Sequence, residues 1–359
     1  MSNIYEKLRE RLDLFPQGFP KTASGVELEI LKNLYSANEA KIALSLGPFP
    51  ETVSTIAERM NKDKNDLGEI LYQMSKKGLI LRYKESEEII YYFLAPWMIG
   101  IWEFQVNRLT ESNIKLYEKY FQEGMVPLNK TKKVSGFRVI PIQKEIQDTT
   151  EIQPYEKVFE VIEDQTRFAV ADCICRKEAK MMGNGCGKLL EACLMFGFAA
   201  DYYIENELGR EISKEEAKDV LIKAEKDGLI HFSSNHADNK MFICNCCGCC
   251  CKALANITKY DNPGVITKSN YYASLNAETC DGCEICIDRC QVDAIRVEND
   301  IASINLDKCI GCGLCVSTCP TQSISMIHKA PDVLPHIFAN DNELTQARAQ
   351  DTNKVFPFA

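Results

Sequence analysis

The stretch Cys280-Asp-Gly-Cys-Glu-Ile-Cys-Ile-Asp-Arg-Cys290 is followed later in the chain by Cys309-Ile-Gly-Cys-Gly-Leu-Cys-Val-Ser-Thr-Cys319. Both segments have the spacing C-x2-C-x2-C-x3-C, and each cysteine of the second segment lies 29 residues after its counterpart in the first. A repeat that keeps all of its cysteines in register is an internal duplication. These two cysteine quartets therefore belong to one duplicated unit, whose fold they decide.

Cysteines at this spacing are typical of loops that ligate [4Fe–4S] clusters, because three thiolates wrap three iron corners and a fourth completes the set. Zinc knuckles differ, since they use two C-x2-4-C pairs separated by a loop. A disulfide framework needs an oxidising compartment, and nothing in the sequence indicates one. The spacing therefore favours iron–sulfur ligation.

With this spacing, residues 276–327 resemble the bacterial-type two-[4Fe–4S] ferredoxin family. The resemblance implies that each cluster takes its fourth ligand from the other quartet. The implied ligand sets are Cys280, Cys283, Cys286 and Cys319 for the first cluster, and Cys309, Cys312, Cys315 and Cys290 for the second. Pro320 follows the last cysteine as in the family, whereas Gln291 replaces the equivalent proline of the first repeat. We expect this replacement to change local rigidity rather than ligation.

Composition and charge indicate the cellular setting. The chain has 359 residues, 18 of them cysteine, and its length allows two or three domains. Residues 1–15 are dense in charge and lack the apolar segment of a signal peptide. The most apolar window, residues 89–104, is too short to cross a bilayer and is interrupted by Pro96 and Glu103. We therefore expect a cytoplasmic protein without a membrane span, whose many thiols bind clusters in an anaerobic organism.

The net charge of −9 argues against general nucleic-acid binding. Between residues 278 and 320 there are eight acidic residues and three basic ones. An acidic surface around a cluster would attract a redox partner with a basic docking surface. Ordinary solvated surface is the alternative explanation of these charges.

The N-terminal module, residues 1–125, has a helical pattern followed by two short apolar runs. The expected helices cover 26–44, 52–60 and 64–77, and the expected strands cover 79–83 and 89–93. This order resembles the winged helix-turn-helix superfamily, which implies DNA binding. Residues 1–100, however, carry 13 basic and 14 acidic side chains without a one-sign stripe. We therefore expect a structural or protein-docking use of the fold.

Two further elements are expected before the cysteine-rich part of the chain. Residues 97–125 continue the helical pattern, with Trp97, Ile101 and Trp102 as core anchors. Residues 137–142 indicate an edge strand or an extended crossing segment, because Pro141 has no N–H to donate to a neighbouring strand.

The middle module, residues 126–275, holds the remaining ten cysteines. A strand at 168–171 leads into the first of them, and a helix over 189–206 is expected to contain Cys193. The candidate ligands of one or two further clusters are Cys173, Cys175, Cys186, Cys193, Cys244, Cys246, Cys247, Cys249, Cys250 and Cys251. They cannot all bind one cluster, because adjacent cysteines point apart. Cys193 is the member most consistent with a buried free thiol inside a helix.

Three interpretations of these ten thiols stay open: further [4Fe–4S] clusters, a zinc or structural metal site, and a catalytic or noncubane cluster. Arg176 could supply positive charge to such a centre. Cys246-Cys247-Gly248 resembles the CCG signature of heterodisulfide-reductase-type subunits, but the second copy that this signature needs is missing. The whole pattern resembles a group of uncharacterised iron–sulfur proteins of anaerobes.

The sequence thus predicts an α+β multidomain protein with domains at 1–125, 126–275 and 276–330 and a tail at 331–359. We expect an electron-transfer protein or oxidoreductase subunit that relays electrons through two to four [4Fe–4S] clusters. The alternatives are a redox-sensing winged-helix regulator and an oxidoreductase with a catalytic cluster among Cys173–Cys251. The sequence contains no G-x-G-x-x-G or Walker motif, so no flavin or nucleotide site is expected.

Overall fold

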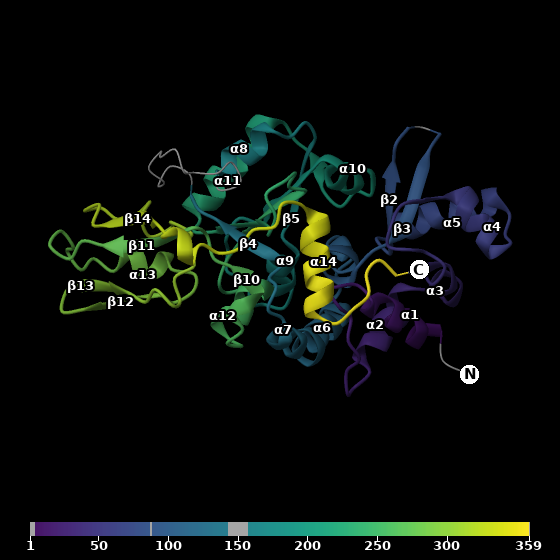
Figure 1. Ribbon diagram of the computed structural model, residues 1–359, viewed down its shortest axis with the longest axis horizontal. Coiled ribbons are helices and arrows are strands. Elements are labelled where there is room, and N and C mark those ends of the chain that lie inside the picture. The colour runs from purple at the N-terminus through teal and green to yellow at the C-terminus, as the bar shows by residue number, and fades with distance from the viewer. Residues whose placement is uncertain (1–3, 87, 143–156, 359) are drawn as a thin grey trace. The chain divides into compact units, whose positions relative to one another are not determined.

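The computed structural model of this α+β protein describes residues 4–86, 88–142 and 157–358. The chain divides into two compact units, which we call the helical unit and the cysteine-rich unit (Figure 1). The helical unit comprises Met1–Lys132, Asp201–Arg210 and Thr345–Ala359. The cysteine-rich unit comprises Lys133–Ala200 and Glu211–Leu344. The division into four domains stays a prediction.

The first part of the helical unit combines helices with a three-stranded antiparallel sheet, in the order β1-β3-β2. Its elements are α1 (Ile4–Asp13), α2 (Val26–Leu34), α3 (Ala37–Ala43), β1 (Glu51–Thr52), α4 (Val53–Met60), α5 (Lys64–Lys76), β2 (Ile80–Lys84) and β3 (Ile90–Leu94). From α4 to β3 each element begins within one residue of its predicted start. The predicted helix over 26–44 is instead two helices, because Ser36 and Glu39 form a capping box that starts α3.

The prediction of one helix over 97–125 was wrong. The segment contains η1 (Trp97–Ile101), η2 (Glu103–Gln105), α6 (Glu111–Tyr120) and η3 (Phe121–Met125), and α7 (Val126–Thr131) follows. Non-helical backbone inside η1 and a capping box at Thr110 interrupt the helical path. Trp97, Ile101 and Trp102 are nevertheless buried, as expected of core anchors. The Trp97 ring centroid lies 5.1 Å from that of Phe19.

The C-terminal tail contains η7 (Pro331–Val333) and α14 (Asp341–Asp351). Within the helical unit, residues after α14 pack against the end of α1. The Lys354 ammonium forms an ion pair with Asp13, at 3.0 Å. The Phe358 ring packs edge-on against Phe15, with centroids 5.0 Å apart. Both ends of the described chain thus contribute to this unit.

A seven-stranded sheet with the order β10-β4-β8-β9-β6-β5-β7 forms the centre of the cysteine-rich unit. The strands are β4 (Phe137–Ile140), β5 (Phe168–Asp172), β6 (Glu191–Phe196), β7 (Arg210–Glu211), β8 (Ile230–Ser234), β9 (Phe242–Cys246) and β10 (Ile266–Thr267). The expectation that residues 137–142 form an edge strand was wrong, since β4 pairs with both β10 and β8. The strand ends at Ile140, so Pro141 lies just outside the paired region.

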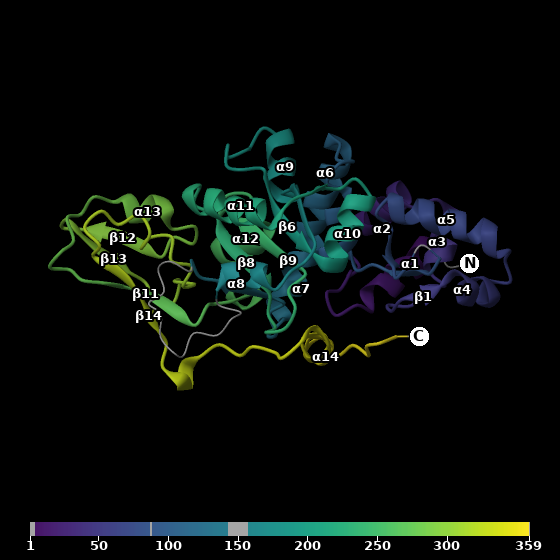
Figure 2. The same cartoon turned by 90° about the horizontal axis from the view of Figure 1, so that it is seen from above.

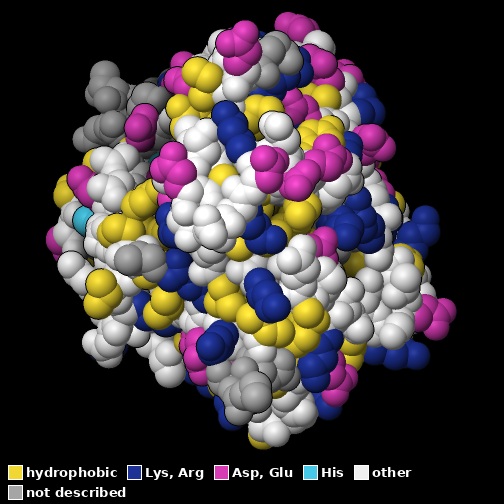
Figure 3. All heavy atoms as spheres, turned by 90° about the vertical axis from the view of Figure 1, so that its right-hand side faces the viewer, with side chains coloured by type: hydrophobic (Ala, Val, Ile, Leu, Met, Phe, Trp, Pro, Cys, Tyr) yellow, Lys and Arg dark blue, Asp and Glu magenta, His cyan; other side chains and the backbone are white. Residues whose placement is uncertain are grey.

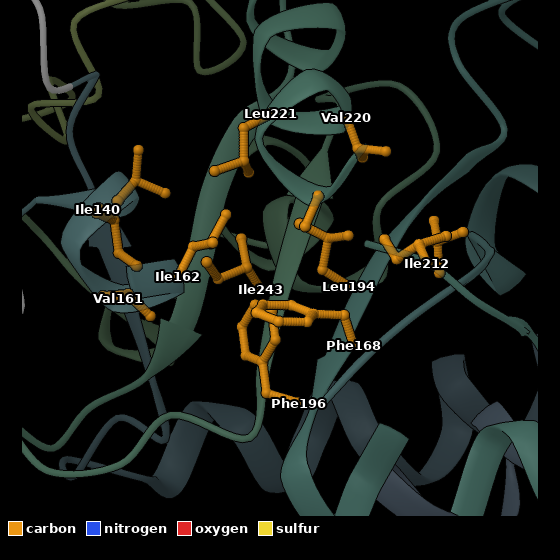
Figure 4. Close-up of a cluster of buried hydrophobic side chains, with 13 residues drawn as sticks. Ile140, Val161, Ile162, Phe168, Leu194, Phe196, Ile212, Val220, Leu221 and Ile243 are labelled. Carbon is orange, nitrogen blue, oxygen red and sulfur yellow. The ribbon is translucent and has the colours of Figure 1, made fainter. Parts of the chain in front are cut away.

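Helices cover both faces of this sheet. On one face, α8 (Val158–Glu163) and α11 (Lys214–Lys226) bury an apolar cluster in which Leu194 and Ile243 of the strands lie near Leu221 (Figure 4). Each such side chain contributes about 1.5–3 kcal/mol when it is removed from water. On the other face, α12 (Lys252–Thr258) packs Leu254 into a second cluster that includes Cys246. Successive residues of β9 therefore face opposite sides, as a strand requires.

The last part of the cysteine-rich unit holds both cysteine quartets. It contains β11 (Tyr271–Leu275), α13 (Ile285–Arg289), β12 (Ile295–Glu298), β13 (Ile301–Ile304) and β14 (Ile324–His328). Strand β11 pairs with β14, and β12 pairs with β13 (Figure 2). Each quartet follows a strand and is followed by another, so the duplication is also visible in the fold. In the described chain, no helix combines the length and apolarity needed to cross a membrane. The remaining helices are α9 (Ile174–Met181), α10 (Gly197–Glu205) and η6 (Pro263–Val265).

Candidate metal centres

The two cysteine quartets line two separate cavities. The first is lined by Cys280, Cys283, Cys286 and Cys319. The second is lined by Cys290, Cys309, Cys312 and Cys315. Each cavity thus combines three cysteines of one quartet with the last cysteine of the other, in the same sets that the resemblance implies. Their role as cluster ligands stays a prediction, and the structure shows that the four thiols of each set face a common space.

The first cavity lies close to the surface. Cys283 is exposed, and the acidic side chains Asp281 and Glu284, both exposed, contribute to the cavity wall. Burial raises the pKa of the Cys319 thiol, but hydrogen bonds from Thr321 and from backbone N–H groups outweigh burial and lower it. A thiol with a lowered pKa loses its proton more easily when a metal binds.

The second cavity lies deeper. Burial raises the pKa of Cys312 to about 12 and that of Cys315 well above its usual range. The Ala294 N–H donates a hydrogen bond to the Cys290 sulfur at 3.2 Å, and such donors stabilise negative charge on cluster ligands. The Ile142 N–H donates to the Cys312 carbonyl at 3.1 Å, which ties this loop to the end of β4. These thiols stay protonated until a metal displaces their protons.

The prediction that Cys193 lies in a helix over 189–206 was wrong. Residues 191–196 form β6, and the helix α10 begins only at Gly197, whose φ of +50° favours glycine. Pairing with β5 and β9 on both sides explains the strand, because apolar residues such as Leu194 are buried on one of its faces. Cys193 therefore lies opposite Cys244 instead of inside a helix.

Four of the ten middle-module cysteines form a compact group, which we call the tetrad: Cys186, Cys247, Cys249 and Cys250. Their sulfur atoms all lie within 4.8 Å of one another, with Cys186 and Cys247 at 4.0 Å and Cys249 and Cys250 at 3.7 Å. Four thiolates around one ion at a metal–sulfur distance of about 2.3 Å lie roughly 3.8 Å apart. The tetrad thus has the ligand number of a metal centre. A cubane would separate its sulfurs further, since each thiolate caps a different iron.

The tetrad comes from two segments. Cys186 belongs to the loop before β6, and the other three belong to the turn between β9 and α12. The apolar side chains of Ala192, Ala224 and Leu229 pack beside it. Burial raises the pKa of Cys186, but hydrogen bonds from the Lys188 backbone and from the other tetrad thiols outweigh burial and lower it. Cys249 is exposed, and burial of the thiol nevertheless raises its pKa to about 11.

The other six middle-module cysteines lie outside the tetrad, and they are Cys173, Cys175, Cys193, Cys244, Cys246 and Cys251. The expectation that adjacent cysteines point apart agrees with the split between Cys246 and Cys247. Cys249 and Cys250, in contrast, are adjacent and both belong to the tetrad.

A close contact joins the tetrad to the second cavity. Gly248, between Cys247 and Cys249, donates its N–H to the Gln291 Oε1 at 2.8 Å. Gln291 follows Cys290, which lines the second cavity. The sequence pointed to Gln291 only as a departure from proline, and its role as a hydrogen-bond acceptor was missed. Arg289, just before Cys290, also donates to the Glu225 carbonyl, which fastens this loop to the end of α11.

Comparison with known proteins identifies one part of the chain. Residues 273–326 match the family described as 4Fe-4S dicluster domain. This match contains both cavities and implies two 4Fe-4S clusters. No curated protein matches the chain. The similarity of residues 26–95 to a winged helix has no support from these comparisons. The dicluster domain and the tetrad together point to an iron–sulfur, electron-carrying protein.

Proposed function

We propose that this chain carries electrons between a protein partner and a thiolate-bound iron centre at the tetrad, through the two [4Fe–4S] clusters of the dicluster domain. The observation that carries the proposal is the hydrogen bond between Gly248 and Gln291, because it joins a loop of the second cavity directly to the tetrad turn. The proposed relay then has three redox centres, which we call its stations: one in the first cavity, one in the second cavity and one at the tetrad.

The first cavity is the station that meets the partner. Exposed Cys283 brings a ligand of this cluster to the surface. All eight acidic residues between 278 and 320 are exposed, and they are Glu278, Asp281, Glu284, Asp288, Asp293, Glu298, Asp300 and Asp307. A field of one sign accelerates encounters with a partner of opposite charge and loses strength as salt is added. The partner of this chain is therefore a redox protein with a basic docking surface.

The second cavity is the station that passes electrons inward. Its cysteines Cys290, Cys309 and Cys312 pack against the same apolar cluster that contains Leu254 of α12 and Cys251. Such a cluster keeps water away from the centre, and burial and hydrogen bonds to sulfur are two of the means by which a protein sets cluster potentials. The covalent path from Cys290 through Gln291 and across one hydrogen bond reaches Gly248, which is bonded to Cys247 and Cys249.

The tetrad is the third station only if its metal changes oxidation state. Iron satisfies this condition as a single tetrathiolate ion, which the sulfur spacing of the tetrad fits, whereas zinc has no redox chemistry. The first test is therefore the metal content of the anaerobically purified full chain. We expect about eight irons from the dicluster domain and about one more that depends on the tetrad. If the metal that is lost when tetrad cysteines are replaced is zinc, the tetrad is excluded from the relay.

The second test measures the docking surface. Cytochrome c, a basic one-electron acceptor, serves as the probe, and the dithionite-reduced chain is mixed with it in a stopped-flow instrument. We expect the bimolecular rate of wild type to fall steeply between low and high salt. The double variant Asp281→Asn/Glu284→Gln should react several-fold more slowly at low salt. The matched control is Glu215→Gln/Asp219→Asn, which removes two exposed acids from α11. Equal slowing in both variants would contradict docking at the first cavity.

A further inference from the structure

The six cysteines outside the tetrad form a group of their own in the cysteine-rich unit. Three of them come from the sheet. Cys193 and Cys244 are cross-strand partners in β6 and β9, so their side chains lie on the same face of the sheet. Cys246 follows two residues after Cys244 and shares this face, which is opposite to the face of the apolar cluster around Leu194.

The other three come from the starts of two helices. Cys173 is the residue before α9, and its N–H donates to the Leu190 carbonyl at 2.8 Å, which holds it beside the start of β6. Cys175 lies in the first turn of α9. Cys251 is the residue before α12. Cys173 and Cys251 are almost fully buried, at 5% and 4% exposure.

Mutual interaction between neighbouring thiols links these six into a ring. Cys173 interacts with Cys175 and Cys193, and Cys175 interacts with Cys251. On the other side, Cys244 interacts with Cys193 and Cys246, and Cys246 interacts with Cys251. The order around the ring is Cys173, Cys175, Cys251, Cys246, Cys244 and Cys193. Each thiol has two ring neighbours, so the group is a closed arrangement of thiols drawn from four elements, β6, β9 and the starts of α9 and α12.

Arg176 provides an independent sign that an anionic group belongs here. Its side chain is buried, with 3% exposure, and its Nη1 donates to the Asn245 carbonyl at 2.9 Å and lies 3.9 Å from the Cys247 sulfur. Its Nε and Nη2 have no hydrogen-bond acceptor within the described residues. A buried donor without an acceptor destabilises the folded chain, and a charged one does so more strongly. The guanidinium of Arg176 interacts electrostatically with the ring thiols Cys173 and Cys193.

The composition of the ring selects the class of ligand. Sulfur ligands without carboxylate or imidazole favour copper(I), zinc and iron–sulfur clusters over hard cations. A single tetrahedral ion uses four thiolates, so a ring of six exceeds what one ion takes. Copper– and zinc–thiolate centres contain no inorganic sulfide. An iron–sulfide centre contains inorganic sulfide, and its sulfides would accept hydrogen bonds from Nε and Nη2 of Arg176.

We propose that the ring of Cys173, Cys175, Cys251, Cys246, Cys244 and Cys193 binds a polynuclear iron–sulfide centre, separate from the tetrad metal, with Arg176 as hydrogen-bond donor to its sulfides. Each thiol that becomes a ligand releases its proton when the centre forms. The site goes beyond the relay proposed above, because none of its ligands belongs to the tetrad or to the dicluster domain.

The test compares two variants that each remove two neighbouring thiols from the full chain. The ring variant is Cys193→Ala/Cys244→Ala, and the matched tetrad variant is Cys249→Ala/Cys250→Ala. Both are purified without oxygen, and iron, zinc, copper and acid-labile sulfide are measured per chain. We expect the ring variant to lose at least about two irons with a similar amount of sulfide, and to keep the metal that the tetrad variant loses. Electron paramagnetic resonance of the reduced dicluster domain reports whether each variant is folded.

Several outcomes overturn the proposal. A folded ring variant that keeps all wild-type iron and sulfide shows that the ring binds no cluster. Loss of zinc or copper without sulfide refutes the iron–sulfide class. If the ring variant does not fold, native mass spectrometry of the wild-type holoprotein decides: a mass explained by the dicluster iron and the tetrad-dependent metal alone refutes the extra centre. Failure of the relay is distinguishable, because it appears as a redox-inactive tetrad while the ring metal is unchanged.

Discussion

Gly248 is the position where a single methyl group should separate the tetrad turn from the dicluster domain. A Cβ at this residue would lie 3.1 Å from the Gln291 carbonyl carbon and closer still to its oxygen. Both are backbone atoms, so no side-chain rotation relieves the clash. The φ of Gly248 is outside the left-handed region, so the close approach alone requires glycine.

The cost of Gly248→Ala has two parts. Overpacking against backbone typically costs 1–3 kcal/mol, and loss of the hydrogen bond from Gly248 to Gln291 at 2.8 Å adds about 0.5–1.5 kcal/mol. We expect a total of about 2–4 kcal/mol, which lowers the melting temperature of a unit of this size by roughly 4–16 °C. Gln291→Ala removes only the side-chain acceptor and should cost only about 0.5–1.5 kcal/mol.

The assay is thermal unfolding of the anaerobic holoproteins, followed by the loss of cluster absorbance. Gly68→Ala is the matched control, because Gly68 lies inside α5 and its added Cβ would meet only Val53 at 3.5 Å. We expect the control to melt at or above the wild-type temperature, since alanine favours helix. The reasoning is refuted if Gly248→Ala melts like the control, or if Gln291→Ala is as destabilised as Gly248→Ala.

Three further predictions concern other parts of the chain. Burial lowers the pKa of Lys240 to about 7. Above pH 7 the unfolded chain therefore binds more protons than the folded chain, and the stability of wild type rises with pH. The melting temperature of wild type minus that of Lys240→Met should increase from pH 7 to pH 9. Tyr35→Phe leaves the buried Leu79 carbonyl without its 2.7 Å donor and should cost about 1 kcal/mol in denaturant unfolding, whereas Tyr72→Phe at an exposed position should not. Duplex DNA should show no mobility shift with either oxidised or reduced protein, and a salt-sensitive shift would contradict this expectation.

The DNA prediction rests on the charges around α5. Two lysines at its end form ion pairs within the helical unit: Lys76, its last residue, with Glu207 at 3.2 Å, and Lys77, the residue that follows, with Glu39 at 2.7 Å. On the face of the molecule that includes α4 and α5, basic and acidic side chains are interspersed (Figure 3). A phosphate-binding surface needs a continuous basic area, which this face does not have.

Local spacing made the dicluster domain readable from sequence. The ligands Cys280, Cys283 and Cys286 lie within seven residues of one another, so their spacing can be recognised from the sequence alone. The helices α4 and α5 were equally readable, since apolar periodicity and a C-terminal glycine at Gly78 are local signals.

The middle module was not readable in the same way, because its sites depend on pairing between distant segments. The register of β6 against β9 places Cys193 beside Cys244, and nothing within residues 189–206 reveals that partner. The one local signal was Gly197, where the strand ends and the helix begins. The division into tetrad and ring follows from the fold, since Cys246 and Cys247 are adjacent in sequence and belong to different sites.

The assembly of the helical unit from both ends of the chain has a consequence for biosynthesis. Asp13 and Phe15 are synthesised long before Lys354 and Phe358, so their contacts with these residues form only when residues 345–359 have been made. Both cysteine quartets are complete before that point. Loading of the clusters can thus precede closure of the helical unit, and removal of residues 345–359 should leave metal content intact while helices α1 and α2 become sensitive to protease.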